Sequence, residues 1–181
     1  MTPAQILLKR RMALLMPLAL GCGLSHGATR NMRIGTYALS TMKAMKGLTF
    51  PRVLLYNSSR QLVPRDSWPA ALNAVKAVAG DAFCCVSDKP TPPGHLGPPP
   101  DCRVVVYGEN LAEHFQGLQD QHGNPLTYGD LPAHEYLIVE YHAAWCAPCI
   151  PARKALETFL ASPGGRSYAA LVIDFTKLAT A

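Results

Sequence analysis

The sequence predicts an α/β protein, and two patterns carry this prediction. In the second half of the chain, apolar runs at residues 136–141 and 168–175 flank residues 147–161, whose apolar side chains have helical spacing. A strand, a helix and a strand within about 40 residues predict a βαβ unit with two parallel strands. The same strand–helix–strand order occurs at residues 52–86, so an N-terminal region of similar type is expected to join the βαβ unit.

The composition of the chain excludes several classes of protein. Its 181 residues are 49% hydrophobic, which is too apolar for a disordered chain. Lys and Arg outnumber Asp and Glu by 17 to 12, a net charge of +5, but three of these charges lie at residues 9–11. Without the N-terminal segment an excess of about two positive charges remains, so electrostatics give no case for a nucleic-acid partner.

The N-terminus has the pattern of a secretory signal. Three basic residues at 9–11 precede an apolar run at 12–20, and small residues follow up to Ala28. A permanent membrane helix needs about 20 apolar residues, which this run does not reach. We therefore expect a signal peptide over residues 1–27 and a mature protein in the periplasm. Two alternatives stay open: a lipid anchor on Cys22, and an N-terminal helix buried in a cytosolic protein.

The first half of the chain is expected to contain a linker and a small α/β region. Residues 28–47 suit a linker with some helical character, and residues 48–114 suit the α/β region. Ser67 suits the cap of a helix that Gly80 ends, and Asn110 suits the cap of a second, short helix. Apolar runs predict strands at residues 52–56, 82–86 and 103–107, and a proline-rich run predicts a loop at residues 89–100.

The second half, residues 115–181, is expected to open with a hairpin over residues 118–126, because Gly and Asn form its turn. The strand that follows is apolar on both faces, as in the middle of a sheet. In the helix after it, Arg153 and Lys154 are expected on the solvated face. His142, two residues after Glu140 on the same strand face, is expected to be packed or at the surface, with tuning of the thiolate as the alternative. The other histidines are assigned no function.

Residues 145–149, Trp-Cys-Ala-Pro-Cys, lie between the predicted strand and helix of the βαβ unit. Cys146 is expected at the helix N-terminus, where unpaired N–H groups and the helix dipole stabilise the nucleophilic thiolate. Cys149 is near enough in sequence to attack a mixed disulfide formed by Cys146. Pro148 suits the first helical turn, and Trp145 can shield the sulfur. The pattern therefore predicts redox chemistry.

Other interpretations of the six cysteines stay open. The pair at 146 and 149 can instead form a structural disulfide, or half of a zinc site completed by His142 and another cysteine. Cys84 and Cys85 are adjacent in a predicted strand and so lie on opposite faces. One of them can pair with Cys102 across the proline-rich loop, remain a buried thiol, or belong to a second redox pair that passes electrons to Cys146.

Two segments of the second half resemble a known family. The segment YLIVEYHAAWCAPC at residues 136–149 resembles the active-site segment of thioredoxin-fold proteins. The segment before it, residues 115–131, resembles the leading hairpin of the TlpA-like exported bacterial thiol-disulfide reductases. The resemblance covers about residues 115–176 and implies a thioredoxin-like βαβ unit with its leading hairpin.

The resemblance also implies site residues and partners. Cys146 would be the nucleophile, Cys149 the resolving cysteine, and Glu140, six residues before Cys146, the buried acid that takes the proton of Cys149. No organic cofactor is implied, because the dithiol carries the electrons. The implied partners are protein thiols and disulfides and a membrane-bound redox protein, with membrane contact only through the signal or a lipid anchor.

One family feature is expected to be missing. In that family a cis-proline loop, a hairpin and a last helix follow the second strand of the βαβ unit, whereas here no proline follows Pro163 and the sequence ends at Ala181. Either the chain is truncated or diverged, with weakened activity, or strands of the first half complete a rearranged sheet. We favour the first explanation, so the thioredoxin-like part is expected to be incomplete at the C-terminus.

The predicted function is that of a thiol-disulfide oxidoreductase, which exchanges or reduces disulfides in exported proteins through its CxxC dithiol. Two other functions remain as alternatives. One is a non-enzymatic periplasmic binding or assembly factor on a degenerate thioredoxin fold. The other is a metal carrier that uses the cysteine pair.

Overall fold

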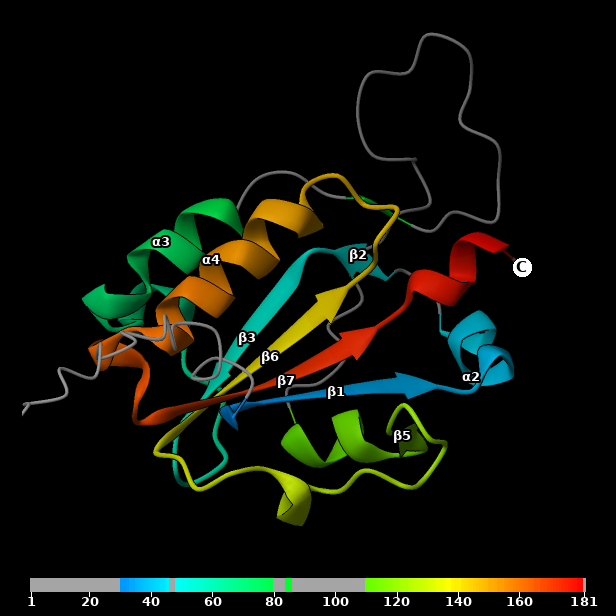
Figure 1. Ribbon diagram of the computed structural model, residues 1–181, viewed down its shortest axis with the longest axis horizontal. Coiled ribbons are helices and arrows are strands. Elements are labelled where there is room, and N and C mark those ends of the chain that lie inside the picture. The colour runs from blue at the N-terminus through cyan, green and yellow to red at the C-terminus, as the bar shows by residue number, and fades with distance from the viewer. Residues whose placement is uncertain (1–29, 46–47, 80–83, 86–109, 181) are drawn as a thin grey trace, which may run out of the picture.

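The computed structural model describes residues 30–45, 48–79, 84–85 and 110–180. At its centre is a five-stranded sheet with the strand order β3-β6-β7-β1-β5, which makes this a mixed α/β structure (Figure 1). Several predicted features lie outside the described residues, namely the signal peptide over 1–27, Cys22, the loop at 89–100, Cys102 and the strand at 103–107.

The predicted βαβ unit is confirmed at the centre of this sheet. Strands β6 (Tyr136–His142) and β7 (Tyr168–Asp174) are parallel, and helix α4 (Cys149–Ala161) connects them. Five consecutive residues of β6 are buried, because both faces of the strand are covered. The helix begins at Cys149, two residues later than the sequence pattern indicates.

The first half of the chain supplies two more strands of the same sheet. Strand β1 (Met32–Tyr37) lies parallel to β7, and β3 (Arg52–Tyr56) lies antiparallel to β6. The linker expected over residues 28–47 is therefore wrong for β1, although α2 (Leu39–Ala44) agrees with the helical character expected there. Strands of the first half thus belong to the same sheet as the βαβ unit.

A separate two-stranded ribbon pairs a segment just before β3 with a segment that follows α3. Strand β2 (Thr49–Phe50) pairs antiparallel with β4 (Cys84–Cys85), the described part of the strand expected at 82–86. The peptide bond between Phe50 and Pro51 is cis, and β3 begins at the next residue. An antiparallel bridge between Tyr56 and Leu62 closes a hairpin after β3, and α3 (Asn73–Val78) follows.

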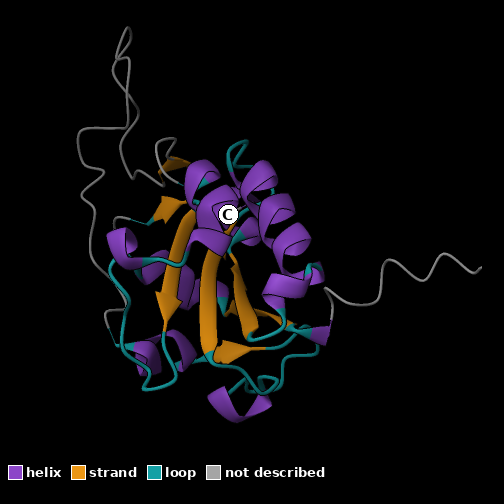
Figure 2. Cartoon of the chain, turned by 90° about the vertical axis from the view of Figure 1, so that its left-hand side faces the viewer, coloured by secondary structure: helices purple, strands orange, loops and turns teal. Residues whose placement is uncertain are grey.

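Helical segments cover both faces of the sheet (Figure 2). Helices α3 and α4 lie side by side over one face (Figure 1), where a core packs from Leu55, Trp68, Leu72, Ile138, Leu156 and Phe159. A second core on the other face includes Tyr37, Met42, Phe50, Tyr141 and Phe175. The cap predicted at Ser67 is wrong, because the chain enters α3 through the 3₁₀ turn Ala70–Leu72, whose N-cap is Pro69.

The hairpin predicted over residues 118–126 is confirmed. Strand β5 (Leu118–Gln119) pairs antiparallel with the end of β1, Gln119 forms a bridge with Pro125, and Gly123 adopts a φ of 85° in the turn. Just before it, Asn110 caps the 3₁₀ helix Leu111–Phe115, as expected, by accepting a hydrogen bond from an N–H group of that helix. Among the residues that the structure describes, no helix is long and apolar enough to span a bilayer.

Candidate functional site

The cysteine pair lies where the central strand β6 turns into α4. We call residues 143–148 the cysteine loop. Cys146 is in a turn ahead of the helix, and its carbonyl accepts a hydrogen bond of 2.9 Å from the N–H group of Cys149, the first helical residue. Pro148 is already in a helical conformation, with φ −66° and ψ −20°, and serves as the N-cap. The two cysteines therefore lie close together as thiols at one end of α4, as the spacing predicts.

The end of β7 holds the cysteine loop in place. The N–H group of Phe175 donates to the carbonyl of His142 at 2.8 Å, which continues the pairing of β6 and β7 up to the loop. The Thr176 hydroxyl then accepts a 3.0 Å hydrogen bond from the N–H group of Ala144, inside the loop. Asp174 fixes Thr176 in turn by accepting from its N–H group at 2.9 Å. Sequence reasoning missed these residues, because they follow the second strand and carry no motif.

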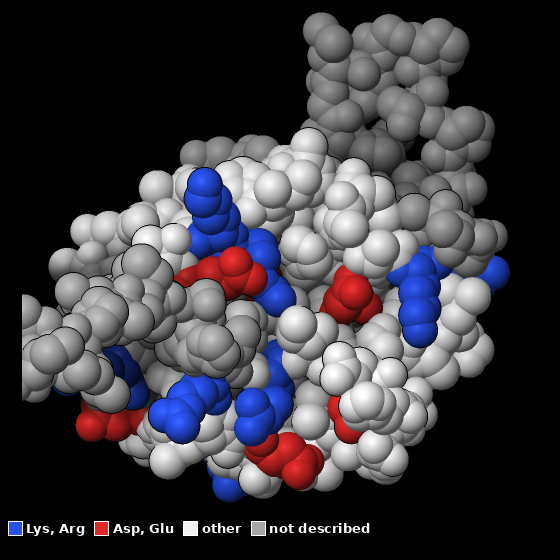
Figure 3. Space-filling model, in the orientation of Figure 1, with Lys and Arg blue, Asp and Glu red and all other residues white. Residues whose placement is uncertain are grey.

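Both sulfur-bearing side chains of the pair are fully buried, with exposed fractions of 0% for Cys146 and Cys149. Apolar groups surround them on the surface, since Trp145 is 36% exposed and Ile150 is 61% exposed. Figure 3 shows this face of the molecule, on which basic and acidic side chains are interspersed over the described surface. Beneath Trp145 lies the buried Phe50, whose ring centroid is 5.4 Å away in an edge-to-face contact. The described surface beside the pair thus includes two apolar side chains, those of Trp145 and Ile150.

Glu140 is a buried carboxylate on β6, as the resemblance implies, but its neighbours are unexpected. Its Oε2 atom lies 3.2 Å from a guanidinium nitrogen of Arg153, and its Oε1 atom lies 3.6 Å from Nδ1 of His142. The side chain of Glu140 is 0% exposed, so the positive charge of Arg153 compensates the carboxylate where water cannot. Arg153 also binds Glu157 at 2.9 Å.

Arg153 corrects the expectation that Arg153 and Lys154 both lie on a solvated helix face. Lys154 is exposed, but the side chain of Arg153 is only 16% exposed and reaches under the helix to Glu140. The helical spacing contains a signal for this position, because Arg153 follows the buried Cys149 by four residues and so lies on the same side of α4. Glu140 therefore lies beneath the first turns of that helix. Its role as proton acceptor for Cys149 stays a prediction.

A second polar cluster lies on the opposite face of β6, where the sequence assigned no function. His114 is 1% exposed, and its two ring nitrogens lie 2.7 Å from the Tyr56 hydroxyl and 3.0 Å from the Tyr141 hydroxyl. Tyr37 donates to the backbone carbonyl of His114 at 2.7 Å. Burial raises the pKa of Tyr141 to about 12. Burial also raises the pKa of Tyr37 far above its ordinary value, and nearby Tyr141 adds to that rise.

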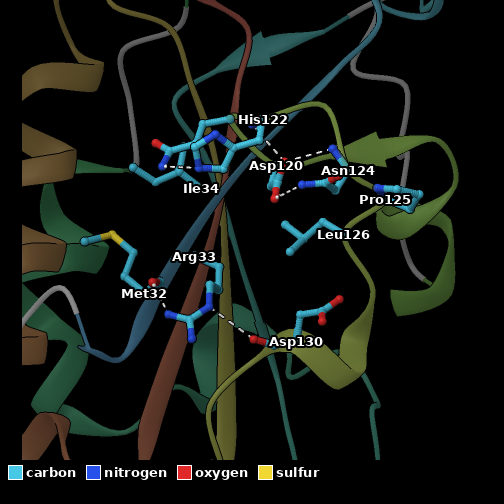
Figure 4. Close-up of a pocket in the computed structure, with 10 residues that line it drawn as sticks. Met32, Arg33, Ile34, Asp120, His122, Asn124, Pro125, Leu126 and Asp130 are labelled. Carbon is cyan, nitrogen blue, oxygen red and sulfur yellow. Dashed lines mark hydrogen bonds between the residues drawn. The ribbon is translucent and has the colours of Figure 1, made fainter.

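A separate hollow of about 760 Å³ lies at the edge of β1 (Figure 4), and none of the predicted site residues lines it. Its polar groups are bonded within the chain. Nε of Arg33 donates to the Asp130 carbonyl at 3.1 Å, and the Asp120 carboxylate accepts from the N–H groups of His122 and Asn124. Hydrogen bonds from Asn124 hold the pKa of Asp120 below its ordinary value. These contacts fix the hairpin loop.

A metal site finds no support in the part of the chain that the structure describes, where no group of three or more His, Cys, Asp or Glu side chains gathers as metal ligands do.

The comparisons with known proteins do not assign this chain to a family. No family model matches this chain, and no curated protein or solved structure matches it.

Proposed function

We propose that this protein is a thiol-disulfide oxidoreductase of exported proteins, built on a thioredoxin-like fold. One observation carries the proposal: two thiols three residues apart lie together in the turn between a central sheet strand and the helix that follows it. In this position the N-terminal end of α4 favours a thiolate, and the second cysteine is within reach of a disulfide on the first. Export through residues 1–27 to the periplasm is part of the same proposal.

The order of elements in the first half supports a rearranged thioredoxin-like fold. The family places a hairpin and a last helix after the βαβ unit. In this chain the hairpin from β3 to Leu62 and α3 follow one another in that order, but ahead of the βαβ unit in the sequence. Strand β3 lies antiparallel to β6, directly beside the strand that leads to Cys146. The proposed fold thus keeps the parts and changes their order along the chain.

The proposed reaction is two successive exchanges of sulfur partners. The Cys146 thiolate attacks one sulfur of a disulfide in the partner protein, and the other partner sulfur leaves as a thiolate. Cys149, after losing its proton, attacks Sγ of Cys146 and releases the second partner sulfur. The partner is reduced by two electrons, and a disulfide between Cys146 and Cys149 remains. Glu140 is the proposed acceptor of the Cys149 proton, and a second dithiol protein restores the pair.

The shielding of both sulfurs adds a requirement to this reaction. Because Cys146 is 0% exposed, a partner disulfide reaches its sulfur only after a neighbouring side chain moves. Trp145 is the side chain placed to do so, since it is partly exposed and precedes Cys146. Its apolar ring, together with the exposed Ile150, then contacts the apolar residues around the partner disulfide.

The test is a redox titration of the purified mature protein in dithiol and disulfide buffers, with thiol trapping and intact mass. We expect two thiols to titrate together at about −270 mV or somewhat higher, in the range of thioredoxin-like dithiols. Cys146→Ser should abolish the transition, while Cys85→Ser should leave it in place. A pair that stays oxidised at far lower potential would show a structural disulfide instead.

The burial of the pair also favours a second candidate function, a periplasmic binding or assembly factor that does not turn over disulfides. In that case the exposed Trp145 and Ile150 would bind a partner while the cysteines only support the loop. Partner binding would then survive Cys146→Ser and be lost on Trp145→Ala. If the protein is an oxidoreductase, disulfide reduction should be lost on Cys146→Ser and should survive Trp145→Ala.

A further inference from the structure

The end of strand β6 places a carboxylate and an imidazole on one face of the sheet. Glu140 and His142 are two residues apart in the strand, so their side chains lie on the same face. This is the face that α4 covers, because Arg153 of that helix lies 3.2 Å from Oε2 of Glu140. His142 is also the last residue of β6, and the cysteine loop begins at the next residue. The two side chains therefore lie at the end of the strand that leads to Cys146.

Each of these side chains has one buried atom that finds no hydrogen-bond partner among the described residues. The atoms are Oε1 of Glu140 and Nδ1 of His142, and they lie 3.6 Å apart. A carboxylate oxygen only accepts a hydrogen bond, and so does an imidazole nitrogen that carries no hydrogen. One proton placed between the two atoms would give both their missing partner after they approach by about 0.5 Å.

The two side chains differ in their access to water. The side chain of Glu140 is 0% exposed, so a proton that it takes up has no direct path to the solvent. The side chain of His142 is 18% exposed although its Nδ1 atom is buried, so water reaches this side chain away from Nδ1. An imidazole can take up a proton at one ring nitrogen and release a proton from the other. His142 thus connects the buried acid with the surface.

The contacts of Arg153 on α4 favour a proton that moves on from Glu140. The guanidinium stabilises the ionised carboxylate and not the protonated acid. Its second partner, Glu157, is 46% exposed in its side chain and lies on the outer side of the contact. Cys149 precedes Arg153 by four residues and so lies on the same side of the helix. A proton from Cys149 that reaches Glu140 is therefore held there only weakly.

The strands on either side of β6 add one titratable side chain to this face in the described part of the chain. Asp174 of β7 is the register partner of His142, and its Oδ1 atom accepts from the N–H group and the hydroxyl of Thr176. Strand β3 places the apolar Val53 beside Glu140. The carboxylate within ion-pair distance of Nδ1 is that of Glu140.

We propose that His142 carries protons between Glu140 and the solvent, and thus is a positioning residue that acts through Glu140. This inference rests on the oxidoreductase function and on the role of Glu140 proposed above. When Cys149 attacks the mixed disulfide, its S–H bond breaks and an O–H bond forms on Glu140. That proton passes to Nδ1 of His142, and the other ring nitrogen releases a proton to water. The partner sulfur that leaves as a thiolate takes up a proton from water.

The return of the cysteine pair to two thiols uses the same path in the opposite direction. The second dithiol protein breaks the disulfide, and Cys149 leaves as a thiolate that takes a proton from Glu140. His142 gives Glu140 a proton from Nδ1 and takes one from water on its other nitrogen. Each full cycle thus restores the starting tautomer of His142. Only protons pass through this residue, so the transfer needs no further oxidant or reductant.

The test measures the resolving step, in which Cys149 releases a disulfide partner from Cys146. The reduced mature protein is mixed with oxidised glutathione and quenched with acid, and mass spectrometry of peptic peptides that span both cysteines follows the bound glutathione. We expect His142→Asn to slow the loss of this glutathione at least tenfold, because an amide forms hydrogen bonds but does not carry a proton. His122→Asn, at an exposed histidine of the hairpin loop, is the matched control and should keep the wild-type rate.

Two further measurements distinguish proton transfer from a structural role of His142. The midpoint of the redox titration should be the same in His142→Asn as in the wild type, because a proton carrier changes rates and not the equilibrium. In His142→Ala, which leaves a gap in place of the ring, imidazole added to the buffer should restore most of the lost rate. A wild-type rate in His142→Asn, or a slow His142→Ala protein that imidazole does not accelerate, would overturn the proposal.

Glu140→Gln separates this inference from the function on which it rests. If Glu140→Gln slows the resolving step and His142→Asn does not, the acid acts without His142 and the inference is wrong. If the pair titrates but neither variant is slow, neither residue carries the proton and the oxidoreductase still stands. If the wild-type pair does not titrate, the oxidoreductase itself is wrong. A slow resolving step in both variants, with rescue by imidazole, supports both proposals.

Discussion

The two faces of strand β6 carry buried polar groups that are satisfied to different degrees. On the face under α4, Glu140 and His142 each keep one buried side-chain atom, Oε1 and Nδ1, without a hydrogen-bond partner among the described residues, and these two atoms lie 3.6 Å apart. On the other face, both ring nitrogens of His114 are within hydrogen-bond distance of tyrosine hydroxyls. Buried polar groups in proteins are nearly always paired, and exceptions concentrate at functional sites.

This difference separates a candidate site from a structural cluster. In the histidine cluster, tyrosine hydroxyls lie within hydrogen-bond distance of both ring nitrogens of His114, so the imidazole needs no hydrogen bond from a ligand. The carboxylate under α4 has a charge balanced by Arg153, but its Oε1 oxygen finds no hydrogen-bond donor in the part of the chain that the structure describes. A group in this state can accept a proton or a hydrogen bond during a reaction, which fits the proton-accepting role proposed for Glu140.

The largest effect is expected on removing the charge that balances Glu140. Arg153→Met leaves an uncompensated carboxylate in the core, and breaking such a buried pair costs about 3–5 kcal/mol of unfolding free energy. Urea denaturation at pH 7 measures the loss. The control, Glu157→Gln, breaks only the exposed contact of the same guanidinium and should cost less than about 0.5 kcal/mol. A double variant that also carries Glu140→Gln should recover most of the loss, and a failure to recover would mean that Arg153 stabilises the helix by other contacts.

The next effect is a loss of stability at alkaline pH from the tyrosines of the other face. Tyr141 has a pKa of about 12 in the folded protein against an ordinary value of 10. Between these values the unfolded chain has released a proton that the folded protein still holds, so stability is complete below pH 10 and falls as pH rises toward 12. The loss from this group amounts to about 2–3 kcal/mol. Denaturation at pH 9 and pH 11 should show a smaller difference for Tyr141→Phe than for the wild type.

A smaller loss of stability is expected when His114, at the centre of the histidine cluster, is replaced. His114→Phe keeps the volume but removes the hydrogen bonds that His114 makes with the buried hydroxyls of Tyr56 and Tyr141, at a cost of about 2 kcal/mol. A triple variant with Tyr56→Phe and Tyr141→Phe should lose less than the single variant, because both hydroxyls are then removed together with the imidazole. The redox transition of the cysteine pair should be unchanged in both. A shifted transition would show that this cluster also serves the site.

The smallest effect is expected at the hydroxyl that anchors the cysteine loop. Thr176→Val removes the acceptor for the Ala144 N–H group and should cost about 1 kcal/mol or less, because Ala144 is exposed and water can replace the bond. The loop should become looser, so alkylation of Cys146 by iodoacetamide should speed up several-fold. Thr158→Val, which loses only a hydroxyl bond within α4, is the matched control and should not change that rate.

Sequence reasoning predicted the parts of this structure that are encoded locally. The strands at 136–141 and 168–175, the helix between them and the hairpin turn all follow from short patterns. The pairing of β3 with β6 and of β1 with β7 was not predictable in this way. The sequence of a single strand does not specify which distant strand it joins or in which register. Strand β1 also lacks a clean alternation, since Arg33 and Ile34 are both exposed and Gly35 is buried.

In the candidate site, too, the contacts between residues close in sequence were predictable and the contacts between distant segments were not. The cysteine pair and its flanking Trp145 and Pro148 were predictable, because residues four apart or fewer set their geometry. The partners of Glu140 were not, since Arg153 is 13 residues away and its guanidinium approaches through the packing of α4 on the sheet. The pairing of β2 with β4 was not predictable for the same reason, because it joins residues more than 30 apart.

The pairing of β1 with β7 sets when this protein can fold during its synthesis. The hydroxyl of Thr36 donates to the carbonyl of Asp174, 138 residues further along the chain. A ribosome that adds about 5–20 residues per second needs roughly 7–30 seconds to make that stretch. For this interval β1 has no β7 to pair with, and that edge of β1 stays open to other chains. A protein with such distant contacts is expected to fold slowly and to depend on being kept apart from its neighbours until its last strand is made.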